Sequence, residues 1–116
     1  MRHHVKGRNF GRPAAQRAAL LKSLMRSLVI HERIATTEAK AKEICPLMEK
    51  MVSRARVDSV ANRRLLVSRL GDPDAVKKLF GTIAPRYAGH TGGYLRITKR
   101  MVKADGRHNA YIAFIK

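Results

Sequence analysis

Apolar residues recur with the period of a helix over most of this chain, and with the period of a strand in only a few short stretches. Helical spacing covers residues 13–30, 37–55 and 59–85. Extended spacing covers residues 31–37, 94–100 and 109–115. The order α-β-α-α-α-β-β predicts an α+β domain, in which a small three-stranded sheet packs its apolar face against about four helices.

Capping and breaking residues mark the predicted helix boundaries. Pro13 fits the first position of a helix, where its missing N–H costs nothing. Thr36 or Thr37 caps the second helix, and Gly71 ends a third helix that starts at Asp58-Ser59. These signals place the first three helices before residue 72.

The remaining helix and the prolines complete the pattern. Asp72 caps a fourth helix with Pro73 at its first position, and Pro85 closes it. Pro46 lies inside the second helix, where a kink is expected. The apolar residues of the third helix are Val60, Leu66, Val67 and Leu70.

The last quarter of the chain predicts a hairpin. The segment 94–100 alternates, so Tyr94, Arg96 and Arg100 are expected on one face, with Leu95 and Ile97 on the other. Residues 109–115 read as a buried strand, joined by a connection over residues 101–108.

The charge is far from balanced. The chain has 25 Lys and Arg against 8 Asp and Glu, a formal net charge of +17. Self-repulsion of that size favours a polyanionic partner, and nucleic acid is the commonest one. The excess lies mainly before residue 34 and after residue 85, which predicts an ordinary globular middle and basic contact surfaces at both ends.

Residues 1–12 form a basic arm with no acid, and residues 13–116 the single globular domain. Glycines in the arm allow a close approach of backbone to a ligand. Arg17 lies at the arm's root, and Lys22 and Arg26 share the polar face of the first helix. A solvated charge face is the ordinary reading, but the lack of acids and the anchoring helix favour nucleic-acid binding.

A second basic candidate surface covers residues 86–100. Arg86, Arg96, Lys99 and Arg100 can contact phosphates there. Tyr87 could stack on a splayed base or pack against the helices, and both alternatives stay open.

Other classes of function find little support. The five histidines have no metal-ligand spacing, one cysteine excludes an internal disulfide, and no catalytic motif appears. We therefore expect no enzyme activity, cofactor, metal or small-molecule substrate. No apolar run reaches the roughly 20 residues of a membrane span, and no signal-peptide core is present.

Several motifs together resemble one protein family. They are M-R-H at the start, G-R-x-x-G-R over 7–12, H-E-R-I-A-T-T-E-A-K-A-K-E over 31–43, A-P-R-Y over 84–87 and G-G-Y-L-R-I over 92–97. In this order they resemble the bacterial-type large-subunit ribosomal protein L-seventeen family. The block over 31–43 is the most specific of them.

The resemblance implies a structural protein of the large ribosomal subunit, in the cytoplasm unless the ribosome is organellar. It would bind ribosomal RNA near the polypeptide exit tunnel, beside other ribosomal proteins. The RNA contacts that the resemblance implies are Arg2, His3, Lys6, Arg8, Arg12, Arg17, Arg33, Lys40, Arg86, Tyr87 and Arg96. Two other classes compete: a basic DNA-compacting protein, and a peripheral protein on anionic membranes, which would need an exposed apolar helix face.

Overall fold

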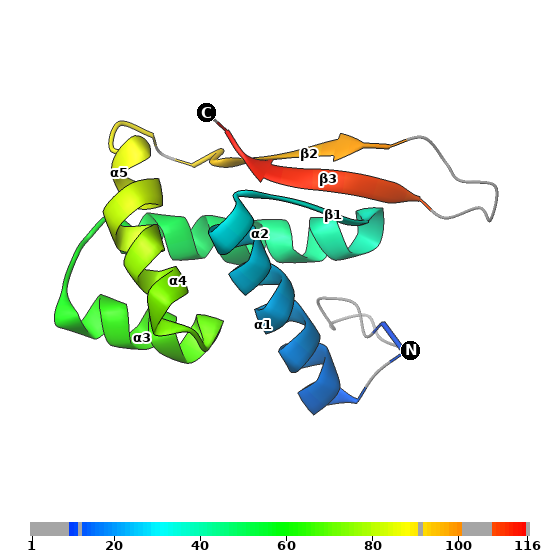
Figure 1. The fold of residues 1–116 in the computed structure, drawn as a ribbon, viewed down its shortest axis with the longest axis horizontal. Coiled ribbons are helices and arrows are strands. Elements are labelled where there is room, and N and C mark those ends of the chain that lie inside the picture. The colour runs from blue at the N-terminus through cyan, green and yellow to red at the C-terminus, as the bar shows by residue number, and fades with distance from the viewer. Residues whose placement is uncertain (1–9, 12, 91, 101–107, 116) are drawn as a thin grey trace, which may run out of the picture.

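A three-stranded antiparallel sheet lies on one side of a long central helix, and the other long helices extend from that helix on the side away from the sheet (Figure 1). This computed structural model describes residues 10–11, 13–90, 92–100 and 108–115. The chain runs through α1 (Ala14–His31), β1 (Arg33–Thr37), α2 (Glu38–Ala55), α3 (Val60–Leu70), α4 (Pro73–Lys78), η1 (Leu79–Ile83), α5 (Ala84–Arg86), β2 (Leu95–Lys99) and β3 (Asn109–Phe114). The predicted α+β class and element order are confirmed.

The sheet has the order β1-β3-β2, so the last strand of the chain is the central one. Ile34, Ile112 and Ile97 form one row across its inner face. Ala110, Ile112 and Phe114 of β3 are buried, whereas the alternating residues between them are half-buried. This period of two turns one face toward α2 and leaves the other to solvent.

Local chemistry sets most helix ends as expected. Thr37 Oγ1 accepts a hydrogen bond from the Lys40 N–H at the start of α2, and Ser59 does the same for Asn62 at the start of α3. Gly71 ends α3 with a positive φ of 70°, a conformation that a residue with Cβ adopts with strain. Helix α2 continues through Pro46.

The final helix is longer than predicted and contains a π-helical turn. Segments α4, η1 and α5 form one continuous helix, which runs past Pro85 to Arg86 instead of closing at the proline. Pro85 has no N–H for the Gly81 carbonyl, and its ring crowds that carbonyl. The wider turn, in which the Ala84 N–H bonds to Leu79 O, lets the helix accommodate the proline.

The core lies between α2, the inner face of the sheet and the other helices. Its largest fully buried side chains include Leu28, Ile44, Met48 and Leu79, together with the two tyrosines discussed below. Val60, by contrast, is an apolar side chain of α3 that is 65% exposed. It occupies the first position of α3, where the helix has not yet reached its neighbours.

Candidate nucleic-acid interface

The outer face of the sheet is the clearest basic surface of the folded body. Arg33 of β1 and Arg96 of β2 both pair in register with Ala113 of β3, so they flank one small residue. Arg100 follows β2 and donates its backbone N–H to Asn109 O. All three arginines are exposed. The strand pairing thus brings together cations that are separated by more than sixty positions in sequence.

Tyr111 lies at the centre of this face, and the sequence analysis missed it. The Arg33 guanidinium carbon is 3.9 Å from the centre of the Tyr111 ring, and that of Arg100 is 4.8 Å from it. Both distances are typical of cation–π contacts. The alternation of β3 could have revealed Tyr111, because Ala110 and Ile112 on either side of it point inward.

Arg33, Arg96 and Arg100 have no acidic partner among the residues that the structure describes. Lys99 differs, because its position in β2 turns it toward the inner side and α2. Its Nζ is 3.5 Å from Glu38 Oε1. Glu38 also pairs with Lys42 at 2.8 Å, and the hydrogen bond from Lys42 is the main cause of its lowered carboxyl pKa. Lys99 is nevertheless 72% exposed, so its charge still faces solvent.

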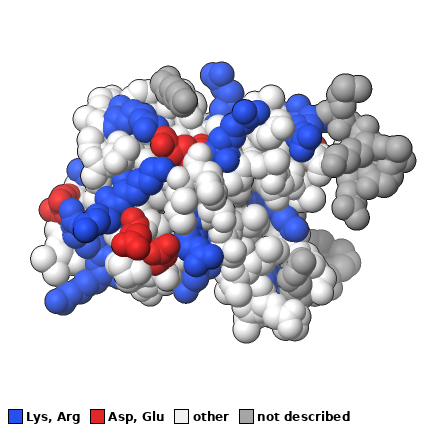
Figure 2. All heavy atoms as spheres, in the orientation of Figure 1, with Lys and Arg blue, Asp and Glu red and all other residues white. Residues whose placement is uncertain are grey.

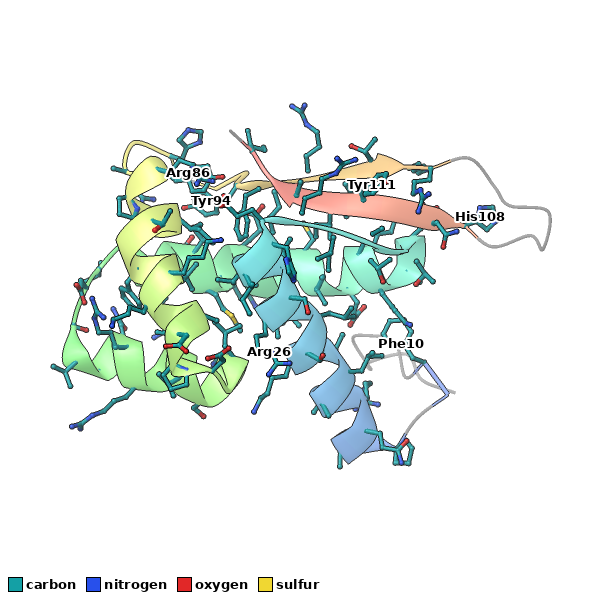
Figure 3. The ribbon with its side chains drawn as sticks, in the orientation of Figure 1. Phe10, Arg26, Arg86, Tyr94, His108 and Tyr111 are labelled. Atoms are coloured by element: carbon teal, nitrogen blue, oxygen red, sulfur yellow. The ribbon has the colours of Figure 1, made fainter. Side chains whose placement is uncertain are left out.

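The basic face of α1 lies elsewhere on the molecule. Figure 3 shows Arg26 and Tyr111 on opposite sides of α2. Lys22 and Arg26 are exposed and line a small hollow of about 180 Å³ beside Leu70 and Gly71, at the end of α3. The structure therefore separates the predicted contacts of α1 from those of the sheet.

Arg86 belongs to an ion-pair cluster that contributes to the fold. Its Nη1 is 2.6 Å from Glu32 Oε1, and Lys78 Nζ is 3.4 Å from Glu32 Oε2. Lys78 also donates to Ile30 O at 2.6 Å, at the C-terminal end of α1. The hydrogen bond from Arg86 is the main cause of the lowered pKa of Glu32. In Figure 2 the acidic side chains visible on this face lie beside basic ones over the helices. The cluster ties the final helix to the end of α1.

Tyr87 packs in the core. Its side chain is 2% exposed, and its hydroxyl donates a hydrogen bond to Ile115 O. Burial raises the pKa of this hydroxyl. Tyr94 is also fully buried, with its ring centre 5.2 Å from that of Tyr87. Neither ring can receive a base without unpacking the core, so the packing alternative describes Tyr87.

Glu49 of α2 and Arg56, which follows the last residue of α2, hold the loop between these tyrosines. Arg56 donates hydrogen bonds to Ala88 O at 2.9 Å, to His90 O, and to the Tyr94 hydroxyl at 3.1 Å. The carboxylate of Glu49 accepts backbone N–H groups of Gly93 at 3.0 Å and of Tyr94 and Leu95 at 3.1 Å. These hydrogen bonds hold the loop against the C-terminal half of α2, and the loop leads directly into β2.

Other predicted contacts are outside the described residues or stand apart. Arg2, His3, Lys6, Arg8 and Arg12 of the arm, and most of the hairpin connection, lie outside the part that the structure describes. Arg17 lies in the first turn of α1, and Lys40 in the first turn of α2, both half-buried. The sequence analysis also passed over Lys50, Arg54 and Arg69. These line an open groove of about 810 Å³ between α2 and α3, with no acid paired to them among the described residues.

Comparison with known proteins decides the family. The family model "Ribosomal protein L17" matches residues 20–116. A "Large ribosomal subunit protein bL17" of Thermomicrobium roseum is 47% identical over 116 residues, covering 99% of each chain. Another of the same name, from a Hydrogenobaculum species, is 42% identical over 118 residues and covers all of both chains.

The chain belongs to the ribosomal protein L17 family. It is accordingly a structural protein of the large ribosomal subunit and works in the ribosome, in the cytoplasm. The family is not known to be enzymatic, which agrees with the predicted absence of catalysis. Among the described residues, no helix is long and apolar enough to cross a membrane.

Proposed function

We propose that the chain binds ribosomal RNA of the large subunit and stabilises the fold of that RNA. One observation carries this proposal: Arg33, Arg96 and Arg100 lie exposed on one sheet face, with no acid paired to them in the described part of the chain. Desolvating an arginine is unfavourable unless an anion binds it, and phosphate oxygens match the guanidinium fork. The folded body fixes where these cations meet the RNA backbone.

The other proposed RNA contacts belong to the basic arm and to α1. The arm's Arg2, His3, Lys6, Arg8 and Arg12 would join Arg17, Lys22 and Arg26 on the side of α1. Because Arg26 and Tyr111 lie on opposite sides of α2, the protein would touch RNA on two faces (Figure 3). A protein held this way can keep two RNA segments in a fixed relation. Lys40 and Lys99 add positive charge near the start of α2.

A salt titration with protein-free large-subunit ribosomal RNA tests the proposal. For six to ten phosphate contacts, affinity should fall roughly 10³- to 10⁵-fold between about 50 and 200 mM salt. Duplex DNA of the same length serves as the competitor. If the DNA displaces the RNA at equal concentration, the chain is a general polyanion binder of the DNA-compacting class, and the ribosomal RNA proposal fails.

We also propose that the site on the subunit is near the polypeptide exit tunnel, beside other ribosomal proteins. The family resemblance supports this position. Crosslinking from residue 96 in assembled subunits would identify the neighbouring RNA and proteins. Crosslinks confined to RNA far from the tunnel opening would contradict it.

Deleting residues 1–12 tests the arm separately. The folded body should keep its unfolding transition, because the buried core residues in the described part of the chain all follow residue 24. Most of the RNA affinity should be lost with the arm's charges. Unchanged affinity would mean that the sheet face alone is the binding site.

A further inference from the structure

Tyr111 is the one aromatic side chain that the described residues place on the outer face of the sheet. Its neighbours in the same row are Ala35 on β1 and Thr98 on β2, both small. Small neighbours leave room beside the ring for long side chains from diagonal positions. Arg33 and Arg100 fill that room from β1 and from the end of β2.

The Arg33 contact is close enough for the guanidinium to stack on the ring. A guanidinium carbon 3.9 Å from the ring centre is at van der Waals distance from the ring plane. Stacking restricts the rotamers of Arg33 before any ligand arrives, so less side-chain entropy is lost on binding. The guanidinium is not paired with an acid in the described part of the chain. Its N–H donors are thus not used by a carboxylate, and the side chain is exposed.

A planar cation that is already stacked on one side matches a particular ligand chemistry. Nucleobases stack on guanidinium planes as well as on aromatic rings. A base inside a duplex is already stacked above and below, so only an unpaired base can add itself to this arrangement. Arg96 and Arg100 lie on the same face and can hold the phosphates that flank such a base.

We propose that Arg33, held in place by Tyr111, forms a stacking site for an unpaired nucleotide of RNA, with Arg96 and Arg100 binding the adjacent phosphates. This inference rests on the proposed RNA-binding function and deepens it. The alternative is that all arginines on this face of the sheet act only as point charges. In that case the planar shape of Arg33 would not matter.

Arg33→Lys separates the two possibilities, because lysine keeps the charge and loses the planar guanidinium. Arg96→Lys is the matched control: it changes the same residue type on the same face, but Arg96 makes no cation–π contact with a ring of the described residues. Binding of both full-length variants is measured to two RNAs of equal length. One is a perfect duplex, and the other carries an unpaired bulge.

Arg33→Lys should weaken binding to the bulged RNA roughly tenfold, the size of one base-stacking contact, and binding to the duplex by less than about twofold. Arg96→Lys should change both by less than about twofold. The slope of log affinity against log salt should stay the same in Arg33→Lys, since no charge is removed. Equal losses in the two variants, or an equal loss on duplex and bulge, would overturn the stacking site.

Tyr111 variants give a second test. Tyr111→Phe keeps the ring and should bind the bulged RNA within about twofold of the native chain, whereas Tyr111→Leu should show a loss like that of Arg33→Lys. A native-like unfolding transition shows that each variant is folded. Native affinity in folded Tyr111→Leu would overturn the positioning role. If the native chain binds neither RNA, the proposed function itself has failed, a different result from any of these.

Discussion

Residues 86–94 and residues 96–100 are neighbouring parts of one basic, aromatic stretch, yet they do opposite things in the fold. In the first part, Arg86 pairs with Glu32, and Tyr87 and Tyr94 are buried. In the second part, Arg96 and Arg100 lie exposed without an acidic partner among the described residues. The two parts meet at Leu95, where β2 begins, directly after the loop that Glu49 and Arg56 hold by hydrogen bonds.

The difference teaches how to separate structural cations from binding ones in a very basic protein. Charge alone does not distinguish Arg86 from Arg96. A cation whose geometry is satisfied by a carboxylate or by carbonyl groups contributes to the fold, as Arg56 and Arg86 do. A cation that the fold holds in the open, as at the sheet face, is available to a polyanion. The following variants test this division.

Tyr94→Ala should have the largest effect, on stability. It removes a fully buried ring that packs on Tyr87 and bonds to Ser53. The loss in unfolding free energy should be about 3–5 kcal/mol, as for other large aromatic truncations in cores. Chemical denaturation measures it. Tyr94→Phe, which keeps the ring, should lose only about 1 kcal/mol. An equally small loss for alanine would contradict the buried position.

Replacing Arg33, Arg96 and Arg100 together by alanine should have the next largest effect, on binding. The slope of log affinity against log salt should decrease by about two to three, and affinity for ribosomal RNA near 0.1 M salt by roughly 100-fold. The unfolding free energy should change little, because these side chains are exposed. A native slope in the folded triple variant would show that the sheet face does not bind RNA.

Arg56→Ala should cost about 2 kcal/mol of unfolding free energy, because it removes the donor to two loop carbonyls and one of the two hydrogen bonds of the Tyr94 hydroxyl. Arg54→Ala is the control two positions earlier in α2. The Arg54 side chain makes no hydrogen bond or ion pair within the described residues, so its removal should cost less than about 0.5 kcal/mol. Similar losses in both variants would refute the specific role of Arg56.

Glu32→Gln should have the smallest effect, about 1 kcal/mol, since its ion pairs are partly exposed. The pKa of Glu32 is lowered below its ordinary value of 4.5, so its contribution is fully present above that pH. The contribution is lost as pH falls below 4.5 through the lower folded-state pKa. The difference between native and variant unfolding free energies should therefore shrink on acidification. A difference that grows instead would contradict the ion-pair cluster.

Most of the fold could be predicted from local sequence because local chemistry sets it. Thr37, Ser59 and Asp72 cap their helices with their own side chains, and Gly71 takes its left-handed conformation within one turn. Pro85 misled the prediction because a π-helical turn, which depends on packing over several residues, accommodates it.

The site was harder to predict because it depends on contacts between residues that are far apart in the sequence. Strand alternation placed Tyr94 on the face of Arg96, but β2 begins only at Leu95, where Glu49 from α2 fixes the backbone. Which arginine has a partner depends on Glu32, which is 54 positions from Arg86. The contacts that Arg33 and Arg100 make with the Tyr111 ring likewise depend on the register of the sheet, which no local pattern contains.

The most direct test of the division between structural and RNA-binding cations uses two single variants, Arg96→Ala and Arg86→Ala. The salt dependence of RNA binding is measured for each. For Arg96→Ala we expect the slope of log affinity against log salt to decrease by about one, with an unchanged unfolding free energy. For Arg86→Ala we expect a native slope and an unfolding free energy lower by about 1 kcal/mol. A decreased slope in Arg86→Ala together with a native slope in Arg96→Ala would contradict the account.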